Sequence, residues 1–430
     1  MKPAGRLPPQ PWMTIPATRA VVAALTRRGQ TVRFVGGCVR DAVLDRSVGD
    51  IDIATPDQPD GVIELAGAAG LKAVPTGIAH GTVTVVAEGR PFEVTTLRRD
   101  VETFGRHARV AFTDDWQADA ERRDFTMNAL FLNPYGEPRG MEDGAIFDPT
   151  GGLEDARAGR VRFVGDAETR IAEDYLRILR FFRFHAHYGR GAADGAALKA
   201  CTKLAAHLAA LSAERVRNEL FKLLAAPVPA TVVALMRGAG VLQVVLPEAA
   251  APAALENLVP LEREFDRADA VRRLAALLPP SAETAKQVAE RLKLSNADTG
   301  RLTALAGQGA DGLRPTTASA DAAVLRRMLR RSGAGRVRDQ VLIDWARSRG
   351  NRSDAAVEAG YRALLASIAL WTPVVFPLKG ADVMALGVPN GKWIGDLLRS
   401  VEEWWEERDY APDRAQCLAE LRRRVAETDV

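Results

Sequence analysis

The 430-residue sequence has little of what disulfide-stabilised, zinc-binding and membrane proteins need. Its three cysteines, Cys38, Cys201 and Cys417, lie far apart. They form neither a disulfide framework nor the close pairs that hold zinc. No apolar run reaches the roughly 20 residues that cross a bilayer, and no apolar stretch follows Lys2 and Arg6 as a signal peptide would require. We therefore expect a cytoplasmic protein that makes no contact with a membrane.

An excess of either charge is also missing. The 58 Lys and Arg residues oppose 55 Asp and Glu residues, which leaves a net charge of +3. So small a charge does not establish a nucleic-acid partner. The arginines nevertheless cluster, at Arg98 and Arg99, at Arg122 and Arg123, at Arg177, Arg180 and Arg183, and at 326–331. Such clusters suit an anionic partner but also occur on solvated helix faces.

The composition changes near residue 150, where β-rich segments give way to helical ones. Before it, strands are expected at 31–37, 48–55 and 81–99, 99–117 reads as a mobile loop, and a helix should run from 118. After the turn signals at 148–159 nearly everything is helical, beginning with one long helix at 167–188. We expect an α/β head with a mixed sheet, followed by an all-helical body and tail. The expected domains are a head at 1–150, a helical neck at 151–225, a body at 226–370 and a tail at 371–430.

The sharpest local feature is a pair of aspartates. Asp50 and Asp52 are two residues apart on an expected strand, so their carboxylates should emerge on one face, while Ile51 and Ile53 turn to the core. Two carboxylates so placed repel each other unless a cation lies between them. Magnesium suits such an oxygen site, and two ions about 3.5–4 Å apart activate a hydroxyl and stabilise a leaving pyrophosphate. A bare pair of this kind is more often two solvated aspartates at a sheet edge.

Residues upstream strengthen the magnesium interpretation. Gly36 and Gly37 form a turn at the end of a strand, before a short helix. Glycines there let backbone N–H groups approach an anion. Arg40, one turn into the helix, is placed to reach a phosphate, and Asp41 is placed to orient it. Together with the aspartate pair, this pattern predicts a site for a nucleoside triphosphate and magnesium.

The segment 34–55, FVGGCVRDAVLDRSVGDIDIAT, resembles the signature of the polymerase-β-type nucleotidyltransferases, specifically the branch of CCA-adding enzymes and bacterial poly(A) polymerases. The resemblance extends through 77–86, 92–100, 121–131, 147–165, 173–189 and 212–220, and is looser at 378–398. It implies a nucleotidyltransferase head in which Asp50 and Asp52 hold catalytic magnesium. It also implies a triphosphate site made of Gly36, Gly37, Arg40 and Asp41.

Further site residues follow from the same resemblance. Glu93, on an expected strand, is a candidate third catalytic carboxylate, although an ordinary surface glutamate is the alternative. Arg122, Arg123 and Asp124 are expected to open a helix, which on its own is a common charged helix start. The resemblance implies that Arg123, Asp124 and Asn128 contact the nucleotide.

Residues of the long expected helix are implied to choose the base. Glu173, Asp174 and Arg177 should share one helix face, where simple ion pairing is the alternative. The resemblance implies that Asp174 and Arg177 pair with the base of CTP or ATP while Glu173 fixes Arg177. Cytosine and adenine both carry an amino group beside a ring-nitrogen acceptor, whereas uracil and guanine would leave buried groups unpaired. Arg180 and Arg183 are expected to contact phosphate or a neighbouring loop.

Three segments are expected to support this template. The segment 148–152 fits a hinge between head and neck, and the loop at 99–117 is the candidate for timing the change from C to A addition. Ser212 should begin a helix in which Glu214 and Arg215 are structural.

The favoured function is addition of CMP, CMP and AMP to the 3′ end of tRNA from CTP and ATP, with Mg²⁺ as cofactor, by a monomer or homodimer. The alternative is a poly(A) polymerase, which should carry a strongly basic extension for single strands. The C-terminal segment instead mixes both signs of charge. A non-catalytic RNA-binding protein is a third possibility, which the intact aspartate pair argues against.

Overall fold

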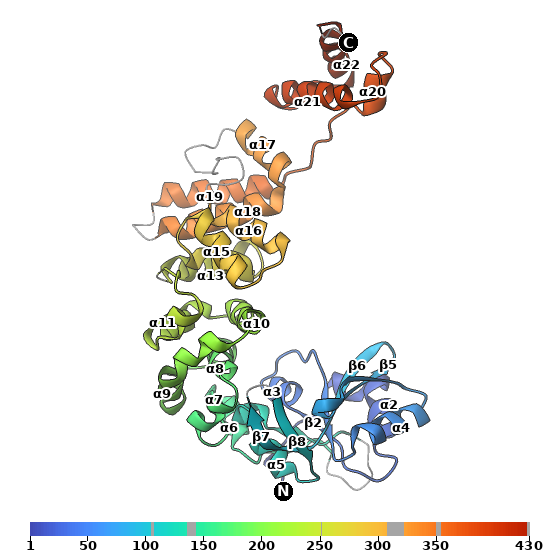
Figure 1. Cartoon of the computed structure of the whole chain (residues 1–430), viewed down its shortest axis with the longest axis vertical. Coiled ribbons are helices and arrows are strands. Elements are labelled where there is room, and N and C mark those ends of the chain that lie inside the picture. The colour runs from blue at the N-terminus through green and yellow to red at the C-terminus, as the bar shows by residue number, and fades with distance from the viewer. Residues whose placement is uncertain (105–106, 136–142, 251, 308–321, 350–353, 428–430) are drawn as a thin grey trace. The chain divides into compact units, whose positions relative to one another are not determined.

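The computed structural model divides into two compact units, Met1–Ala249 and Ala250–Val430. It describes residues 1–104, 107–135, 143–250, 252–307, 322–349 and 354–427, and the side chains of 100–110 are outside this description. Figure 1 shows the elements along the chain. The finer division into head, neck, body and tail stays a prediction.

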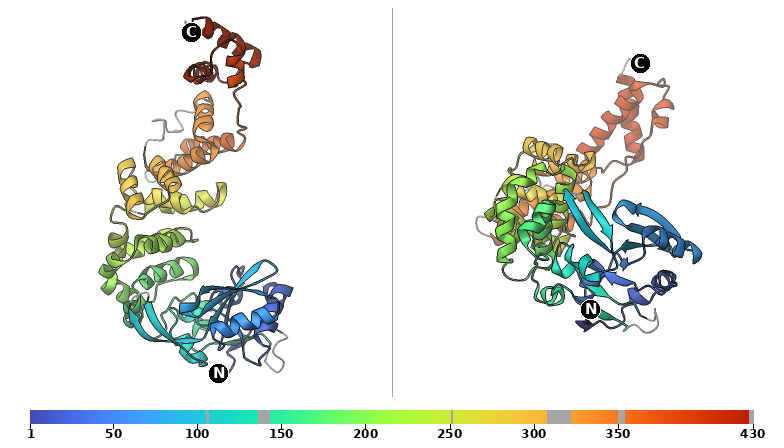
Figure 2. Two further views of the ribbon diagram at one scale, coloured as in Figure 1. Left: turned by 45° about the vertical axis from the view of Figure 1, so that its right-hand side comes forward. Right: turned by 60° about the horizontal axis from the view of Figure 1, so that its bottom comes forward.

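Unit 1 contains the mixed sheet that the sequence predicts (Figure 2). Its strand order is β1-β10-β9-β2-β3-β6-β5-β4. Strands β3 and β6 pair in parallel, and the other neighbours pair antiparallel. The strands are β1 (Gly5–Arg6), β2 (Arg33–Val35), β3 (Asp52–Thr55), β4 (Lys72–Gly77), β5 (Thr82–Ala87), β6 (Arg90–Thr96), β9 (Phe131–Leu132) and β10 (Ala145–Phe147).

Apolar side chains cover both faces of this sheet. Helices α2 (Pro16–Leu25) and α4 (Pro59–Ala68) each begin with a proline, whose fixed φ suits a first helical turn. They pack one face, where Phe34 and Val94 are fully buried. The opposite face is covered by a second cluster around Phe131. This double cover fixes the ends of β2 and β3, where the sequence places its glycines and aspartates.

The predicted loop at 99–117 is wrong. The structure has strands β7 (Arg98–Phe104) and β8 (His107–Phe112), which pair antiparallel in a sheet of their own. The many charged residues hid the alternation typical of strands, and the cross-strand pairing of β7 with β8 supplies the order that periodicity did not show. Helix α5 (Trp116–Glu121) follows. The proposal that this segment times nucleotide choice therefore concerns a strand pair, and its tip at 105–106 is outside the described residues.

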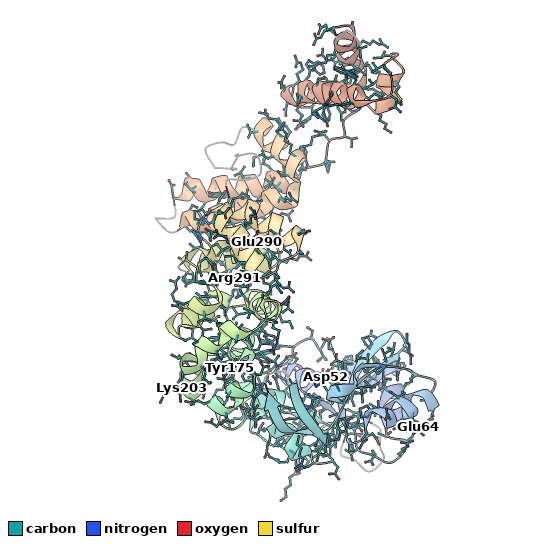
Figure 3. All side chains as sticks on the ribbon, viewed as in Figure 1. Asp52, Glu64, Tyr175, Lys203, Glu290 and Arg291 are labelled. Carbon is teal, nitrogen blue, oxygen red and sulfur yellow. The ribbon has the colours of Figure 1, made fainter. Side chains whose placement is uncertain are left out.

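The single long helix expected at 167–188 is two helices. Helix α7 (Ala167–Glu173) ends at Asp174, whose φ of −155° is extended, and α8 (Leu176–Tyr188) begins after it. Asp174 Oδ1 accepts the Leu176 N–H at 3.1 Å, so its side chain competes with the helical backbone at this point. Figure 3 shows Tyr175 in this turn and Asp52 on the sheet.

The remaining helices of unit 1 lie on both sides of residue 150, and those after it agree with the predicted helical pattern. They are α1 (Pro11–Thr14), α3 (Gly37–Val43), α6 (Gly152–Ala158), α9 (Gly195–Leu204), α10 (Ala213–Leu224), α11 (Pro229–Gly238) and α12 (Val241–Val245), with short 3₁₀ turns η1 (Ile78–His80), η2 (Thr126–Asn128) and η3 (Ala205–Ala210).

Unit 2 is helical throughout the part that the structure describes. Its helices are α13 (Ala253–Phe265), α14 (Ala270–Leu277), α15 (Ala282–Arg291), α16 (Asn296–Ala306), α17 (Ala322–Ser332), α18 (Ala334–Ser348), α19 (Ala355–Ala369), α20 (Gly380–Met384), α21 (Lys392–Glu407) and α22 (Arg414–Glu427). The arginines at 326–331 include Arg330, which pairs with Glu402 and Glu406. Among the described residues, no helix is long and apolar enough to span a bilayer.

Candidate active site

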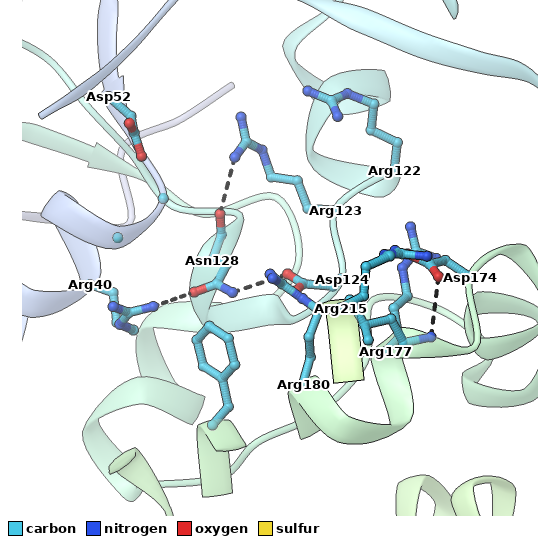
Figure 4. A pocket seen from close by; sticks show the side chains of 14 residues that line it. Arg40, Asp52, Arg122, Arg123, Asp124, Asn128, Asp174, Arg177, Arg180 and Arg215 are labelled. Carbon is cyan, nitrogen blue, oxygen red and sulfur yellow. Dashed lines mark hydrogen bonds and ion pairs between the residues drawn. The ribbon is translucent and has the colours of Figure 1, made fainter. Parts of the chain in front are cut away.

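A polar cavity of about 490 Å³ opens in unit 1 beside the sheet (Figure 4). The turn before α3, strand β3, the segment around η2, and helices α8 and α10 all contribute to it. Its lining residues are Gly36, Gly37, Arg40, Asp52, Arg122, Arg123, Asp124, Asn128, Asp174, Leu176, Arg177, Arg180, Phe184 and Arg215. Most of the residues predicted for the nucleotide site thus share one cavity.

The floor of the cavity requires glycine at position 36. Gly36 has a φ of +73°, which disfavours any residue with a Cβ. A Cβ there would lie 3.5 Å from Arg123 Nη1 and 3.9 Å from Asp52 Oδ2. These are ordinary contact distances, so the positive φ, and not a lack of space, requires glycine here.

Two of the three predicted catalytic carboxylates lie side by side on paired strands. Asp52 on β3 stands opposite Glu93 on β6 in the parallel register. The pKa of Asp52 is raised to about 6: burial and the neighbouring carboxylates Glu93 and Asp50 raise it, and Arg123 and Arg40 oppose them. Asp50 precedes the strand in an exposed bend, so the expected placement of both aspartates on β3 is wrong, whereas Ile51 and Ile53 are buried as predicted.

The chemistry of these carboxylates fits a hard divalent cation. Such a cation prefers oxygen ligands. Its positive charge would offset the repulsion that Glu93 and Asp50 exert on Asp52, which is one cause of the raised pKa. Among the described residues, no three acidic, histidine or cysteine side chains already stand close enough together to hold a metal ion. Magnesium binding by Asp50 and Asp52, with Glu93 as a third carboxylate, stays a prediction.

Arg40 lines the cavity but is largely committed to neighbours. Its side chain donates to Asp41 at 3.0 and 2.9 Å, to Asn128 Oδ1 at 2.6 Å and to the Tyr188 hydroxyl at 2.6 Å. The guanidinium also lies 4.1 Å from the Tyr188 ring centre. Asp41 orients Arg40, as predicted from their spacing. A phosphate reaching Arg40 has to share or replace one of these partners.

A hydrogen-bonded chain continues from Asn128 toward helix α8. Asn128 Nδ2 donates to Asp124 Oδ1 at 3.0 Å, and Arg180 Nε donates to Asp124 Oδ2 at 2.8 Å. Burial would raise the pKa of Asp124, but Arg180 and Asn128 lower it to about 2. Asp124 is therefore an anion that joins the head to α8, and its partner is the predicted site residue Arg180.

The predicted helix opening at 122–124 is wrong. Helix α5 ends at Glu121, and the chain then passes through a turn and bends at 122–124. Phe125 is bridged to Phe163, and the Asp124 carbonyl accepts the Val164 N–H. Backbone pairing to 162–164 overrides the helical appearance of this sequence. Asn128 still lies near Asp124, because the turn η2 replaces the expected helical turn.

Arg122 and Arg123 share one buried partner. The carboxylate of Asp119, on α5, accepts from Arg122 Nε at 2.8 Å and from Arg123 Nη2 at 2.9 Å. Its side chain is 1% exposed. Burial alone would raise the pKa of Asp119, but Arg123 and Arg122 hold it below its usual range. Both arginines consequently face the cavity as fixed cations.

The predicted base template lies at the start of α8. Glu173 pairs with Arg177, and Arg177 Nη1 also donates to the Arg170 carbonyl at 2.7 Å. Among the described residues, Nε and Nη2 of Arg177 have no hydrogen-bond partner. Asp174 accepts from Arg215 Nη2 at 2.7 Å. Because the helix breaks at Asp174, this residue does not share one helix face with Glu173 and Arg177 as predicted. Arg215, which was expected to be only structural, lines the cavity.

Other predicted residues stand behind the cavity or apart from it. Arg183 pairs with Glu219 at 3.2 Å. In the predicted hinge, Asp148 accepts the Gly152 N–H at 2.8 Å, and a Cβ at Gly152 would lie 2.0 Å from the Thr126 carbonyl oxygen. Packing accounts for this glycine. A hinge motion there stays a prediction.

Comparisons with known proteins agree with this geometry. The family model "Poly A polymerase head domain" matches residues 32–162, and "Probable RNA and SrmB- binding site of polymerase A" matches 194–251. The mitochondrial CCA tRNA nucleotidyltransferase 1 of Homo sapiens is 32% identical, over 94% of this chain and 89% of that protein. The chain belongs to the CCA tRNA nucleotidyltransferase family.

Other members of the family agree. A CCA-adding enzyme of Bacillus cytotoxicus is 41% identical over 48% of this chain and 50% of its own length. The crystal structure of the Bacillus stearothermophilus CCA-adding enzyme in complex with CTP has a TM-score of 0.70 at 27% identity, covering 97% of this chain and 100% of that one. The resemblance seen in the sequence is thus confirmed, together with the fold class.

Sequence reasoning missed several residues of this family member's site, including the following four. Arg122 and Leu176 line the cavity, Asp119 holds Arg122, and Tyr188 holds Arg40. The Arg122–Arg123 doublet was a visible signal, because adjacent arginines near an aspartate three and four residues earlier are spaced for one shared partner. Nothing local links Tyr188 to Arg40, which are 148 residues apart.

Proposed function

We propose that this chain adds CMP, CMP and AMP to the 3′ end of tRNA, using CTP and ATP and releasing pyrophosphate. The observation that carries the proposal is one cavity lined by Asp52, by a set of arginines held in place, and by the base-template residues Asp174 and Arg177. The human relative is named a CCA tRNA nucleotidyltransferase, and the Bacillus stearothermophilus enzyme was solved with CTP.

The carboxylates would serve the reacting end of the nucleotide. Asp50 and Asp52, with Glu93 beside Asp52, would hold magnesium, which supplies charge stabilisation for the attacking hydroxyl and the leaving pyrophosphate. Gly36 and Gly37 leave room for phosphate oxygens. Arg122 and Arg123 face that space as cations already held in place, so little reorganisation is needed when the triphosphate enters.

The template would serve the base. Arg177 offers Nε and Nη2 as donors, and Asp174 offers carboxylate oxygens as acceptors. A ring-nitrogen acceptor beside an amino donor, present in both cytosine and adenine, matches that pair. Uracil and guanine place a carbonyl and an N–H there, leaving groups of the cavity unpaired. One site thereby accepts two of the four nucleotides.

Poly(A) addition is the competing function, because both matching family models are named for that polymerase. The full-length likeness favours CCA addition, since it covers 94% of the chain and not the head alone. The mixed charge of the C-terminal segment points the same way. Cytoplasmic location stays a prediction, and the human, mouse and zebrafish relatives are named mitochondrial.

Incorporation of labelled CTP, ATP, UTP and GTP tests the proposal. The acceptors are tRNA lacking CCA, tRNA ending in CC, and an unstructured RNA, with magnesium present. We expect two C and one A on the first acceptor and one A on the second. Open-ended A addition to the unstructured RNA would establish a poly(A) polymerase instead. The control, Asp50→Ala/Asp52→Ala, should be silent, and a wild type equally silent would contradict any transferase function.

A further inference from the structure

The cavity arginines Arg122 and Arg123 depend on a residue that itself faces away from the cavity. Asp119 is not among the lining residues, and its side chain is 1% exposed. Each of its oxygens serves one arginine: Oδ1 accepts from Arg122 Nε at 2.8 Å, and Oδ2 accepts from Arg123 Nη2 and Nε at 2.9 and 3.2 Å. Charge-assisted pairs of this kind fix both direction and distance.

The same carboxylate also joins a third element. Asp119 Oδ1 accepts the backbone N–H of Arg98, the first residue of β7, at 3.3 Å. Strand β7 and its partner β8 begin at this point, where Arg98 pairs with Phe112. One buried oxygen therefore contacts both a cavity arginine and the base of the strand pair.

That carboxylate is the anionic partner that Arg122 and Arg123 share. Arg123 Nη1 also donates to the Asn128 carbonyl, at 3.5 Å, which is long for a hydrogen bond. Arginine side chains carry large rotamer entropy, and a planar guanidinium holds an anion well only when its direction is set beforehand. Arg123 lies beside Gly36 on the floor of the cavity: its Nη1 would be 3.5 Å from a Cβ at position 36. This is the part of the cavity that would face the phosphates.

We propose that Asp119 is a positioning residue for triphosphate binding. Its carboxylate orients Arg122 and Arg123 toward the phosphates beyond the α-phosphate, and it connects these arginines to the first residue of β7, where the β7–β8 pair begins. Asp119 touches no substrate and acts only through the arginines. This inference rests on the proposed function, since it assumes that a nucleoside triphosphate occupies the cavity.

The inference predicts a loss that depends on the number of phosphates. In Asp119→Asn one carboxylate oxygen is replaced by an NH2 group, which cannot accept from an arginine. The remaining oxygen still accepts, but the negative charge is removed and one of the two arginines loses its partner. Affinity for CTP should fall about tenfold, whereas affinity for CMP should change less than about twofold, because CMP lacks the phosphates that the arginines hold. In steady state, KM for CTP should rise while kcat changes less than about threefold.

A matched control comes from the same unit. Asp155 also has a side chain 1% exposed and also holds two arginines, Arg160 and Arg162, at 2.9 and 2.8 Å. It is not among the residues lining the cavity. Asp155→Asn therefore removes an equally buried charge and should lower the melting temperature comparably, while leaving the ratio of CTP to CMP affinity at the wild-type value.

The experiment measures binding of CTP and of CMP to the full chain without tRNA, in wild type, Asp119→Asn, Asp155→Asn, Arg122→Gln/Arg123→Gln and the triple variant. We expect the ratio of CTP affinity to CMP affinity to fall in Asp119→Asn. In the triple variant this ratio should be no lower than in the double arginine variant, because Asp119 acts only through the two arginines. An unchanged ratio in Asp119→Asn, or additive losses in the triple variant, would overturn the inference. If Asp119→Asn does not fold, an unchanged ratio in the double arginine variant overturns it and a lowered ratio supports it. A wild type that binds no CTP would instead defeat the proposed function.

Discussion

Replacing Asp52 by asparagine should abolish transfer and at the same time stabilise the fold. Burial and the neighbouring carboxylates raise the pKa of Asp52 from 3.8 to about 6. The folded protein thus binds this proton more tightly than the unfolded chain does, so the ionised carboxylate opposes folding above pH 6. A shift of that size corresponds to at most about 3 kcal/mol, and solvent in the cavity should reduce the gain of Asp52→Asn to about 1–3 kcal/mol.

The sign of the effect fixes its pH dependence. The destabilisation is complete above the folded pKa, fades as the pH falls from about 6 to 4, and is absent below the unfolded value. The stability gap between Asp52→Asn and wild type should therefore about halve between pH 8 and pH 5. Asparagine keeps the shape of the side chain, so packing contributes little to the gap.

Urea unfolding of wild type, Asp52→Asn and Asp50→Asn, with chelator present, measures this gap. Asp50 is exposed and outside the strand, so Asp50→Asn should gain distinctly less. Added magnesium should stabilise wild type and narrow the gap, because a bound cation replaces the missing neutralisation. An Asp52→Asn protein less stable than wild type at pH 8, or a gap that does not change with pH, would refute the reasoning.

Three further predictions concern positions elsewhere in unit 1. Arg215→Ala removes the 2.7 Å partner of Asp174, and selectivity for CTP over UTP should fall about tenfold, measured as the ratio of kcat/KM values; an unchanged ratio would contradict a template role. The Arg33 guanidinium lies 4.4 Å from the Trp116 ring centre, and burial lowers the pKa of Arg33 to about 10. Arg33→Lys should lower the free energy of unfolding in urea by about 1–2 kcal/mol, since an ammonium group cannot stack on a ring as a planar guanidinium does; an unchanged free energy would contradict this. Asp194 accepts the Ala197 N–H at the start of α9 at 2.8 Å; Asp194→Ala should lower the free energy of unfolding by about 1 kcal/mol without changing activity, and a larger activity loss would contradict a purely capping role.

The parts of the site that the sequence predicted are those defined by short spacing. The glycine turn, Arg40 beside Asp41, and the burial of Ile51 and Ile53 follow from strand and turn geometry within a few residues. The pairing of Asp52 with Glu93 did not, because parallel strands separated by 40 positions are registered by the whole sheet. The sequence offered Glu93 only as a candidate, equally well explained as a surface residue.

The errors share a physical cause. At 167–188 and 122–124 the residues have helical composition, yet side chains and backbone groups elsewhere offer better hydrogen bonds. The Asp174 side chain accepts the Leu176 N–H just before α8, and the Asp124 carbonyl accepts the Val164 N–H. Tertiary partners of this kind override local propensity. They also create the site, since the same breaks in the helices turn Asp174 and Asp124 toward Arg215 and Arg180.

The pairing of charges around the cavity has a consequence for how it selects its ligand. Six arginines line the cavity together with three aspartates, and Asp41, Asp119 and Glu173 stand behind them as partners of Arg40, Arg122 and Arg177. Positive and negative groups are therefore equal in number. Such a site exerts little long-range pull on polyanions, which keeps stray RNA backbone from settling there. An anion binds there only when its oxygens lie where individual arginine N–H groups point. The cavity therefore distinguishes a nucleotide from a nucleic-acid backbone by the geometry of short-range hydrogen bonds.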